Sequence, residues 1–242
     1  VGGVLGGVVY MNSDLDEQIE RVFVLAKERQ LNLDFHVDEN GNPESVGLRE
    51  VARAVIKYQF SGRVICGHCC SLAVQPPGLV METIELVKEA GIGVVNLPAT
   101  NIYLQDRSFQ RTPRWRGVTL LHELKRAGVP VAIASDNCRD PFCSFGDRDL
   151  LEVFKLAVKI AHLDLPFSDW PQAVTKISAE LMGLADVGKI GVGLPADLIL
   201  FKGRNFSELL SRPESDRVVL RNGKAMDTTL PDYRELDDLI NS

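Results

Sequence analysis

The sequence has few histidines, no long apolar run and no excess of basic residues, and each shortage narrows the class of protein. Only four of the 242 residues are histidine, so a histidine-based site has few candidates. The net charge of −6 disfavours nucleic acid as a partner, because such partners need a basic face. No run reaches the roughly 18 apolar residues of a membrane span, so we expect no membrane partner either.

Cysteine is also scarce, and its count is odd. The five cysteines are Cys66, Cys69, Cys70, Cys138 and Cys143. An odd number in a chain of this length argues against a disulfide framework and for a reducing, cytoplasmic setting. The first three could form half of a zinc site, but no second pair of ligands follows at suitable spacing. We therefore expect buried or pocket-edge thiols.

Apolar strand-like and helix-like segments alternate along most of the chain. Strands are predicted over 1–9, 31–36, 63–68, 93–97 and 129–136, and helices over 14–29, 44–58, 79–90, 116–127 and 147–162. Shorter helices are predicted over 170–177 and 179–184. Such units call for right-handed crossovers and a parallel sheet. The strand over 93–97 leads into a long polar connection up to Gly117, and loops of that length are usually functional.

The pattern changes near Gly188. Two antiparallel-type strands are predicted over 193–201 and 217–224, with an Asn222-Gly223 turn in the second and one helical turn over 206–210 between them. The acidic end, residues 230–242, is expected to fray or pack loosely. We therefore predict two domains, a (β/α) domain over 1–187 and part of a small β domain over 188–242.

Ionisable residues stand at the ends of three predicted strands. They are His36, His68 and Asp136, and Glu39 follows His36 by three residues. Strand ends of a parallel barrel converge at its C-terminal mouth, so these side chains can share one cavity. Imidazoles and carboxylates hold divalent metals, and a partly buried carboxylate can carry protons. The alternative reading of each histidine alone is a hydrogen-bonded structural residue.

Other polar residues have simpler interpretations. His122 and His162 fall within or at the end of a predicted helix and are expected to be structural. Asp38 is a candidate helix cap or loop hydrogen-bonder. A zinc site of the kind that combines His-x-Glu with Pro-Cys-x-x-Cys is disfavoured, since here the spacing is His-x-x-Glu and Ile65 precedes Cys66.

Five segments in a consistent order carry a family resemblance. They are Asp34-Phe35-His36-Val37-Asp38-Glu39, Gly67-His68, Asn101-Ile102-Tyr103-Leu104-Gln105-Asp106-Arg107, Arg116-Gly117-Val118-Thr119 and Ser135-Asp136-Asn137-Cys138-Arg139-Asp140-Pro141-Phe142. Together they resemble the cytosine deaminase branch of the metal-dependent amidohydrolase superfamily. The stretch from Gly193 to Leu200 resembles that superfamily's returning β-sandwich strand. The resemblance implies an α/β fold of the (β/α)₈ TIM-barrel type with a small β-sandwich.

The resemblance also assigns roles to residues of this chain. His36 and Asp136 would be ligands of one divalent metal ion, Fe²⁺ or Zn²⁺. Glu39 would carry protons between water and a ring nitrogen, and His68 would help to activate that water. The remaining residues are assigned to substrate binding: Asn137, Phe142 and Asn101. Cytosine deaminases usually have a second Asp and a Trp at the first two of these positions, which leaves the identity of the base open.

One departure from the family pattern is larger. The family's first strand carries a His-x-His pair, and this chain has none and begins with Val1. We therefore expect the barrel to be incomplete, with about strands 4–8 present and the His-x-His pair upstream.

The expected function is that of a hydrolase acting on carbon–nitrogen bonds, which releases ammonia from a cytosine-like aminopyrimidine ring in the full-length protein. Alternatives are hydrolysis of another C–N bond on a nitrogen heterocycle, of N-alkyl or triazine type, or a non-catalytic fragment. The expected partner is a small nitrogen heterocycle, and a homo-oligomer is a further expectation to test.

Overall fold

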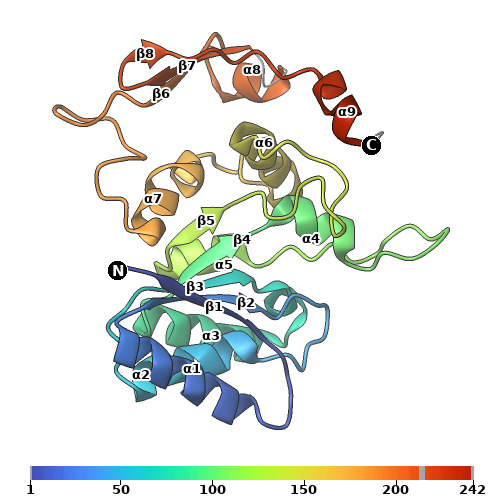
Figure 1. Ribbon diagram of the computed structural model, residues 1–242. Helices are drawn as coiled ribbons and strands as arrows, with labels where there is room; N and C mark the ends of the chain where they lie inside the picture. The colour runs from blue at the N-terminus through green and yellow to red at the C-terminus, as the bar shows by residue number, and fades with distance from the viewer. Residues whose placement is uncertain (1, 213–215, 241–242) are drawn as a thin grey trace. The chain divides into compact units, whose positions relative to one another are not determined.

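The computed structural model describes residues 2–212 and 216–240 of the chain, in two compact units. The first unit comprises residues 1–188 and the second residues 189–242. Figure 1 traces the first unit from its N-terminal strand in blue to its last helix in orange. Among the described residues, no helix is both long enough and apolar enough to cross a membrane.

Five parallel strands form the sheet of the first unit, in the order β1-β2-β3-β4-β5. The strands are β1 (Val4–Val9), β2 (Asn32–Val37), β3 (Val64–His68), β4 (Gly93–Asn96) and β5 (Val131–Ile133). The helices are α1 (Leu15–Arg29), α2 (Gly47–Lys57), α3 (Pro77–Glu89), α4 (Pro98–Leu104), α5 (Leu121–Ala127), α6 (Leu150–Ala161) and α7 (Lys176–Met182). Short 3₁₀ helices span Cys70–Val74 and Trp170–Val174. Parallel neighbours joined through helices are the repeating unit of a (β/α) barrel, which confirms the predicted parallel α/β architecture.

Residues of strand β2 alternate between the two faces of the sheet, and the two sets differ in polarity. Leu33 and Phe35 are buried on the face covered by helices, and Phe35 stacks on Phe23 of α1 with ring centroids 6.1 Å apart. Asp34 and His36 alternate with them and line a cavity of about 390 Å³ on the opposite, inner face. The two-residue period of a strand therefore directs ionisable side chains inward from an otherwise apolar segment.

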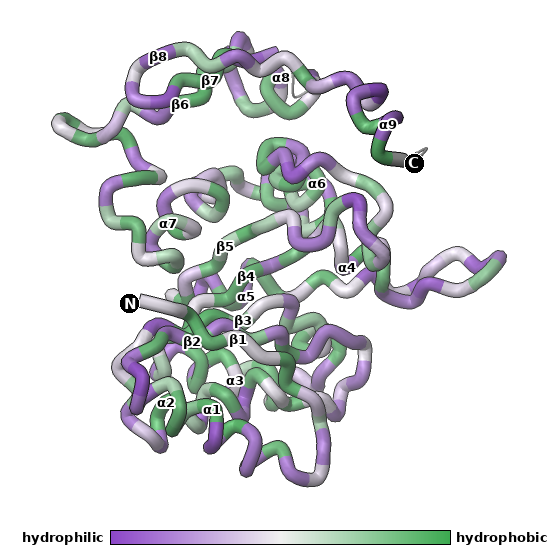
Figure 2. The backbone as a smooth tube through the Cα atoms, viewed as in Figure 1, coloured by the Kyte–Doolittle hydropathy of each residue, from purple (hydrophilic) through white to green (hydrophobic). Residues whose placement is uncertain are grey.

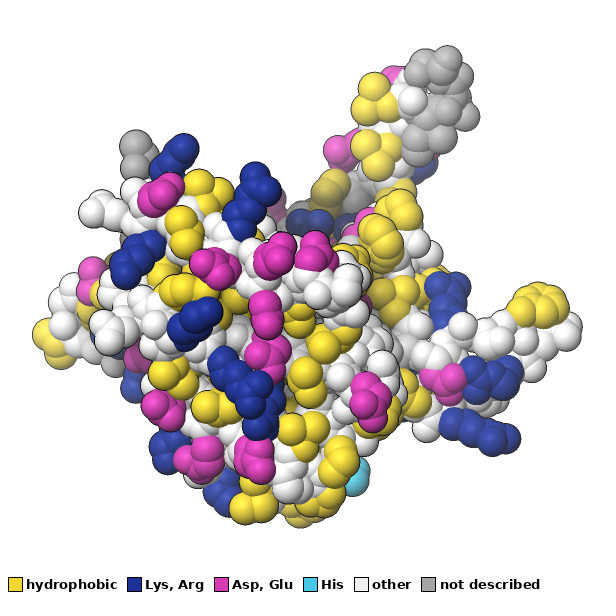
Figure 3. All heavy atoms as spheres, turned by 90° about the horizontal axis from the view of Figure 1, so that it is seen from below, with side chains coloured by type: hydrophobic (Ala, Val, Ile, Leu, Met, Phe, Trp, Pro, Cys, Tyr) yellow, Lys and Arg dark blue, Asp and Glu magenta, His cyan; other side chains and the backbone are white. Residues whose placement is uncertain are grey.

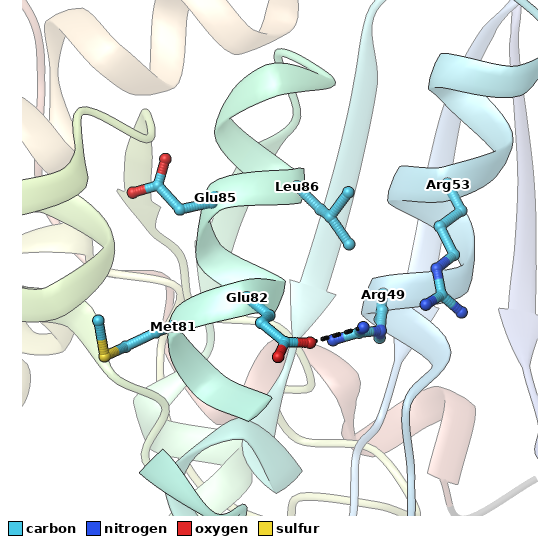
Figure 4. Close-up of a pocket in the computed structure, with 6 residues that line it drawn as sticks. All are labelled: Arg49, Arg53, Met81, Glu82, Glu85 and Leu86. Atoms are coloured by element: carbon cyan, nitrogen blue, oxygen red, sulfur yellow. Dashed lines mark hydrogen bonds and ion pairs between the residues drawn. The ribbon is translucent and has the colours of Figure 1, made fainter. Parts of the chain in front are cut away.

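Helices α2 and α3 lie beside each other on the outer face. Figure 2 shows hydrophilic and hydrophobic stretches alternating along this helical layer. Arg49 of α2 donates to Glu82 of α3, with Nη2 and Oε2 2.8 Å apart, beside a groove that Met81 and Leu86 also line (Figure 4). Lys and Arg side chains are intermixed with Asp and Glu on the face shown in Figure 3. Charges of both signs are typical of a solvated helical surface.

The connection after β4 differs from the prediction. It contains the short helix α4, which begins at Pro98, where the fixed φ of proline suits a first helical turn. The helix predicted over 116–127 begins only at Leu121, because Gly117 has a φ of +69° that no right-handed helix accepts. The strand predicted over 129–136 is shorter in the structure: β5 spans Val131–Ile133, and single backbone hydrogen bonds at Pro130 and Ala134 extend its pairing with β4 by one residue at each end.

The second unit contains a three-stranded antiparallel sheet in the order β6-β7-β8, which confirms the small β structure predicted there. Its strands are β6 (Leu198–Phe201), β7 (Arg217–Arg221) and β8 (Lys224–Ala225), with α8 (Phe206–Ser211) between the first two. Asn222 and Gly223 both have positive φ, as a type I′ hairpin turn requires. The tail forms a 3₁₀ turn (Tyr233–Leu236) and α9 (Asp237–Ile240), and residues 230–239 are all exposed, which agrees with the loose packing expected there. Residues 241–242 lie outside the described part.

Candidate active site

His36 and His68 are brought together by two adjacent strands. In the parallel register of β2 and β3, Val37 pairs with His68 and His36 pairs with Gly67. His68 ends β3 with a φ of +68°, a conformation that is uncommon outside glycine. The two rings then lie with centroids 5.0 Å apart, and Nε2 of His68 is 3.2 Å from Nδ1 of His36.

The contacts of His68 favour one tautomer. Its Nδ1 lies 2.8 Å from Oδ1 of Asn101 and 3.5 Å from Oε1 of Glu39. Both oxygens accept hydrogen bonds, so Nδ1 carries the ring proton and donates it. In the neutral ring, Nε2 then keeps its lone pair, which faces His36. The side chain of His68 is 1% exposed and is shielded from bulk water, whereas His36 is exposed and Glu39 is partly buried.

The set of lone pairs around His36 fits a cation. Ligand atoms of His36, Glu39 and His68 lie within 4.8 Å of one another. Oδ2 of Asp136 is buried, has no hydrogen-bond partner among the described residues, and lies 4.0 Å from Nε2 of His68. An unpaired buried carboxylate oxygen is costly unless a cation or proton neutralises it. Imidazole nitrogen and carboxylate oxygen are ligands that divalent zinc accepts.

Asp136 lies three residues beyond the end of β5. Its φ of +63° is left-handed, as at His68. Strained backbone of this kind clusters at functional sites, where the surrounding structure holds it. The next residues form a tight loop around Asp140, whose carboxylate accepts hydrogen bonds from Nδ2 of Asn137 and from the backbone N–H groups of residues 138, 142 and 143. These bonds lower the pKa of Asp140 to about 2, with the Asn137 amide as the largest cause.

The three residues predicted to bind substrate occupy different environments. Asn101 is fully buried behind His68, and its Oδ1 faces the imidazole. Asn137 is partly buried and its amide donates to Asp140. Phe142 is 62% exposed on the same loop. Roles for these three in substrate binding stay predictions.

The structure gives Asp38 and the cysteines structural environments. Oδ1 and Oδ2 of Asp38 accept the N–H groups of Gly47 and Leu48 at 2.9 and 3.0 Å, so this carboxylate caps the first turn of α2. Burial raises the pKa of Asp38, although the two hydrogen bonds oppose the shift. All five cysteines are free and buried, and burial raises the pKa of the Cys66, Cys69 and Cys70 thiols.

Several polar residues near the site were not predicted. Asp34 lines the inner cavity, and desolvation raises its pKa. The sequence could have indicated Asp34, since it lies two residues before His36 on the same strand and therefore on the same face. Thr100 and Gln105 are buried beside Asn101 and hydrogen-bond to backbone oxygens next to Asp136 and at Glu39. The burial of these two residues depends on α4, a helix that the sequence pattern did not predict.

A family model described as "Amidohydrolase family" matches residues 2–227. The chain is 54% identical over 241 residues to a pterin deaminase of Rhizobium rhizogenes (strain K84), covering 100% of this chain and 55% of that protein. It is 27% identical over 228 residues to an N-isopropylammelide isopropyl amidohydrolase of Pseudomonas sp. (strain ADP), covering 91% of this chain and 52% of that protein. The chain spans about half the length of the curated relatives it matches.

Among solved structures, the chain resembles a 5-methylcytosine deaminase from Klebsiella pneumoniae liganded with 5-fluorocytosine. The TM-score is 0.81 at 27% identity, and the match covers 95% of this chain and 57% of that one. With the family match, this likeness confirms the predicted fold, a partial barrel-type α/β structure with a small antiparallel sheet.

Proposed function

The chain belongs to the amidohydrolase family, and from this premise we propose that the whole protein hydrolytically removes an amino group from an aminopyrimidine ring. One observation carries the proposal. Two imidazoles and the Glu39 carboxylate lie within 4.8 Å of one another, next to an unpaired buried oxygen of Asp136. Further support comes from the similarity to a pterin deaminase and to a 5-methylcytosine deaminase, whose names describe removal of an amino group.

His36 and Asp136 are the residues that would hold the family's metal ion, Fe²⁺ or Zn²⁺, on the inner side of the strand ends. When bound, such a cation lowers the pKa of water toward about 7 and so supplies a nucleophile at neutral pH. The chain's own contribution is to orient that water and to move its protons.

Glu39 is the proposed proton carrier. Its side chain is 32% exposed, so the carboxylate can reach both water and a substrate. It accepts a proton from water as the water oxygen bonds to the ring carbon, and it delivers this proton to the ring nitrogen. The remaining hydroxyl proton then passes by way of Glu39 to the amino nitrogen, and the bond between carbon and that nitrogen breaks, leaving a ring carbonyl and ammonia. The lone pair on Nε2 of His68 accepts a hydrogen bond from the attacking water and so helps to orient and activate it.

A pterin is the favoured substrate class, with a cytosine-like base second. Support comes from the 54% identity to a pterin deaminase. Asn137 and Phe142 also replace the Asp and Trp usual in cytosine deaminases. A second candidate reaction, removal of an N-alkyl amine from a ring, is supported by the 27% identity to an N-isopropylammelide hydrolase.

The test measures the products of the whole protein, expressed at the length its gene encodes and loaded with Zn²⁺ or Fe²⁺. Pterin, cytosine and N-isopropylammelide are supplied separately, and ammonia and isopropylamine are quantified. We expect ammonia from pterin and loss of that activity after chelation. Isopropylamine alone would favour the second reaction, and no amine from any substrate would overturn the deaminase proposal.

The proposed setting is a reducing, cytoplasmic one, supported by five free thiols. The proposed ligand is a small nitrogen heterocycle.

A further inference from the structure

Helix α4 carries a concentration of buried polar side chains that the proposed chemistry does not use directly. Thr100 and Asn101 are 0% exposed, and Gln105, one residue past the helix, is 9% exposed. A buried polar group is costly without a hydrogen-bond partner. Each of these three side chains has a partner, although Nδ2 of Asn101 is buried without one among the described residues. Each partner belongs to a different strand end of the candidate site.

Thr100 contacts the turn that carries Asp136. Its Oγ1 lies 3.3 Å from the carbonyl oxygen of Ser135 and 3.5 Å from that of Asn137. These two carbonyls flank Asp136, whose left-handed backbone needs outside support. The hydroxyl therefore holds the turn that aims the unpaired carboxylate oxygen.

Asn101 contacts the ring of His68. Its Oδ1 accepts from Nδ1 at 2.8 Å, which is shorter than the 3.5 Å to Glu39. This bond fixes both the orientation of the ring and the position of its proton. The opposite nitrogen of the ring then presents a lone pair toward His36.

Gln105 contacts the segment that carries Glu39. Its Nε2 donates to the Glu39 carbonyl oxygen at 3.0 Å. Because the Glu39 side chain is partly exposed, this backbone bond fixes the point from which the carboxylate extends. Gly117 packs directly against Gln105 and Asn101: a Cβ at this position would collide with Gln105 Cγ and lie 3.3 Å from Asn101 Cβ.

The topology explains why such an element is needed. Site residues come from β2, β3 and the segment after β5, and β4 separates β3 from β5 in the sheet. Backbone bonds between neighbouring strands fix only adjacent pairs. Helix α4 follows the intervening strand β4 directly, at the end of the sheet where the strand ends meet (Figure 1).

We propose that α4 is a positioning element, in which Thr100, Asn101 and Gln105 set the mutual placement of Asp136, His68 and Glu39. The proposal rests on the proposed function for its catalytic consequence. Each residue acts on a different partner, so its loss has a different signature. Removing supporting hydrogen bonds around a metal site lowers metal affinity or activity by about 10- to 100-fold.

The experiment uses the whole protein and four substitutions. Thr100→Val keeps the shape and removes the hydroxyl, and should weaken Zn²⁺ binding about tenfold or more. Gln105→Leu should leave the Zn²⁺ dissociation constant unchanged and lower kcat more than it changes KM. Asn101→Leu should shift the ¹⁵N resonances of the His68 ring, and Asn101→Asp, which keeps an accepting oxygen, should retain the protonated Nδ1.

The matched control lies on the same helix. Tyr103→Phe removes a hydroxyl that lies 3.4 Å from Ser144 Oγ, and should leave Zn²⁺ affinity, kcat and the His68 spectrum unchanged. If Thr100→Val unfolds the protein, Thr100→Ser retains the hydroxyl and must restore Zn²⁺ affinity. Uniform loss of all readouts in proportion to lowered melting temperature, or no change in any, would overturn the proposal. Zinc affinity and the NMR signature need no substrate, so they decide it even if no aminopyrimidine is deaminated.

Discussion

Two residues of the candidate site, His68 and Asp136, have φ angles of +68° and +63°. Such conformations cost about 1–3 kcal/mol each in a non-glycine residue. A backbone carbonyl oxygen next to each of them accepts a side-chain hydrogen bond, that of Cys69 from Thr119 and that of Ser135 from Thr100. This left-handed backbone directs the side chains of His68 and Asp136 toward the candidate site, where the chain leaves the sheet.

The Glu39 side chain gives the most direct test of the chemistry. Glu39→Gln keeps the shape and removes the ability to accept and return a proton. We expect kcat for ammonia release by the whole protein to fall by about 10²- to 10⁴-fold. Zn²⁺ affinity should stay within about threefold if His36 and Asp136 are the ligands. A large loss of metal instead would assign Glu39 to the metal.

Asp38 belongs to the scaffold rather than to the reaction. Asp38→Asn leaves one accepting oxygen for two N–H donors and places an amide N–H₂ against the other. We expect a loss of about 1–3 kcal/mol in the free energy of unfolding, measured by urea denaturation. Asn40→Ala is a control for the neighbouring loop, since its side chain accepts hydrogen bonds from residues 42, 45 and 71 but caps no helix. Equal stability of Asp38→Asn and the wild type would contradict the capping role.

Residue types at the strand ends could be predicted because the two-residue strand period separates apolar from ionisable positions. The convergence of His36, Glu39 and His68 followed from the parallel sheet. The burial of Asn101 could not be predicted in the same way, because it depends on α4. That helix has seven residues, too few for a clear 3.6-residue period.

At the scale of elements, the strands and the long helices were predictable and the loops beyond β4 and β5 were not. Helices such as α2 have enough turns to show an apolar stripe. In contrast, the loop after Asp136 is held by a single carboxylate, that of Asp140, with four donors. Nothing in the hydrophobic pattern signals such a network.

The Asp140 loop should respond to acid. Hydrogen bonds lower the folded-state pKa of Asp140 to about 2, below the ordinary value near 3.9. The contribution of this carboxylate to loop order is therefore fully present above about pH 4 and is lost as pH falls through about 2. Amide hydrogen exchange at Phe142 and Cys143 should accelerate over this window, relative to intrinsic rates. Asp140→Asn should show the accelerated exchange already at neutral pH; protection that is independent of both changes would contradict this account.

At the scale of the whole molecule, the sheet presents five strands, and β1 is one of its outer strands. Val4 and Val8 of β1 are 58% and 51% exposed. The unpaired backbone N–H and C=O groups of an outer strand are a template for pairing with a further strand, and exposed apolar side chains favour such an association. The curated relatives are nearly twice as long as this chain, since it covers 55% and 52% of them.

Metal binding should depend on chain length. Catalytic zinc sites use three protein ligands, whereas His36 and Asp136, the two proposed ligands, would supply only two. We expect the 242-residue chain alone to bind Zn²⁺ at least about 100-fold more weakly than the whole protein and to release no ammonia. Competition with a chromophoric chelator measures both affinities. Tight stoichiometric binding with turnover by this chain alone would contradict the prediction.

The five buried thiols have a practical consequence for measuring the stability of the first unit. Cys66, Cys69 and Cys70 are 0% exposed, and Cys138 and Cys143 are 8% and 5% exposed. A thiol reacts as its thiolate, which burial disfavours at Cys66, Cys69 and Cys70. Burial also keeps a disulfide reagent from the other two thiols, so we expect all five to be modified only when the structure opens. Labelling of the first three would follow opening of the β3 end, and labelling of the other two would follow opening of the loop after Asp136. The native cysteines thus provide two separate probes, one for each region, whose labelling rates report local and global unfolding without any engineered label.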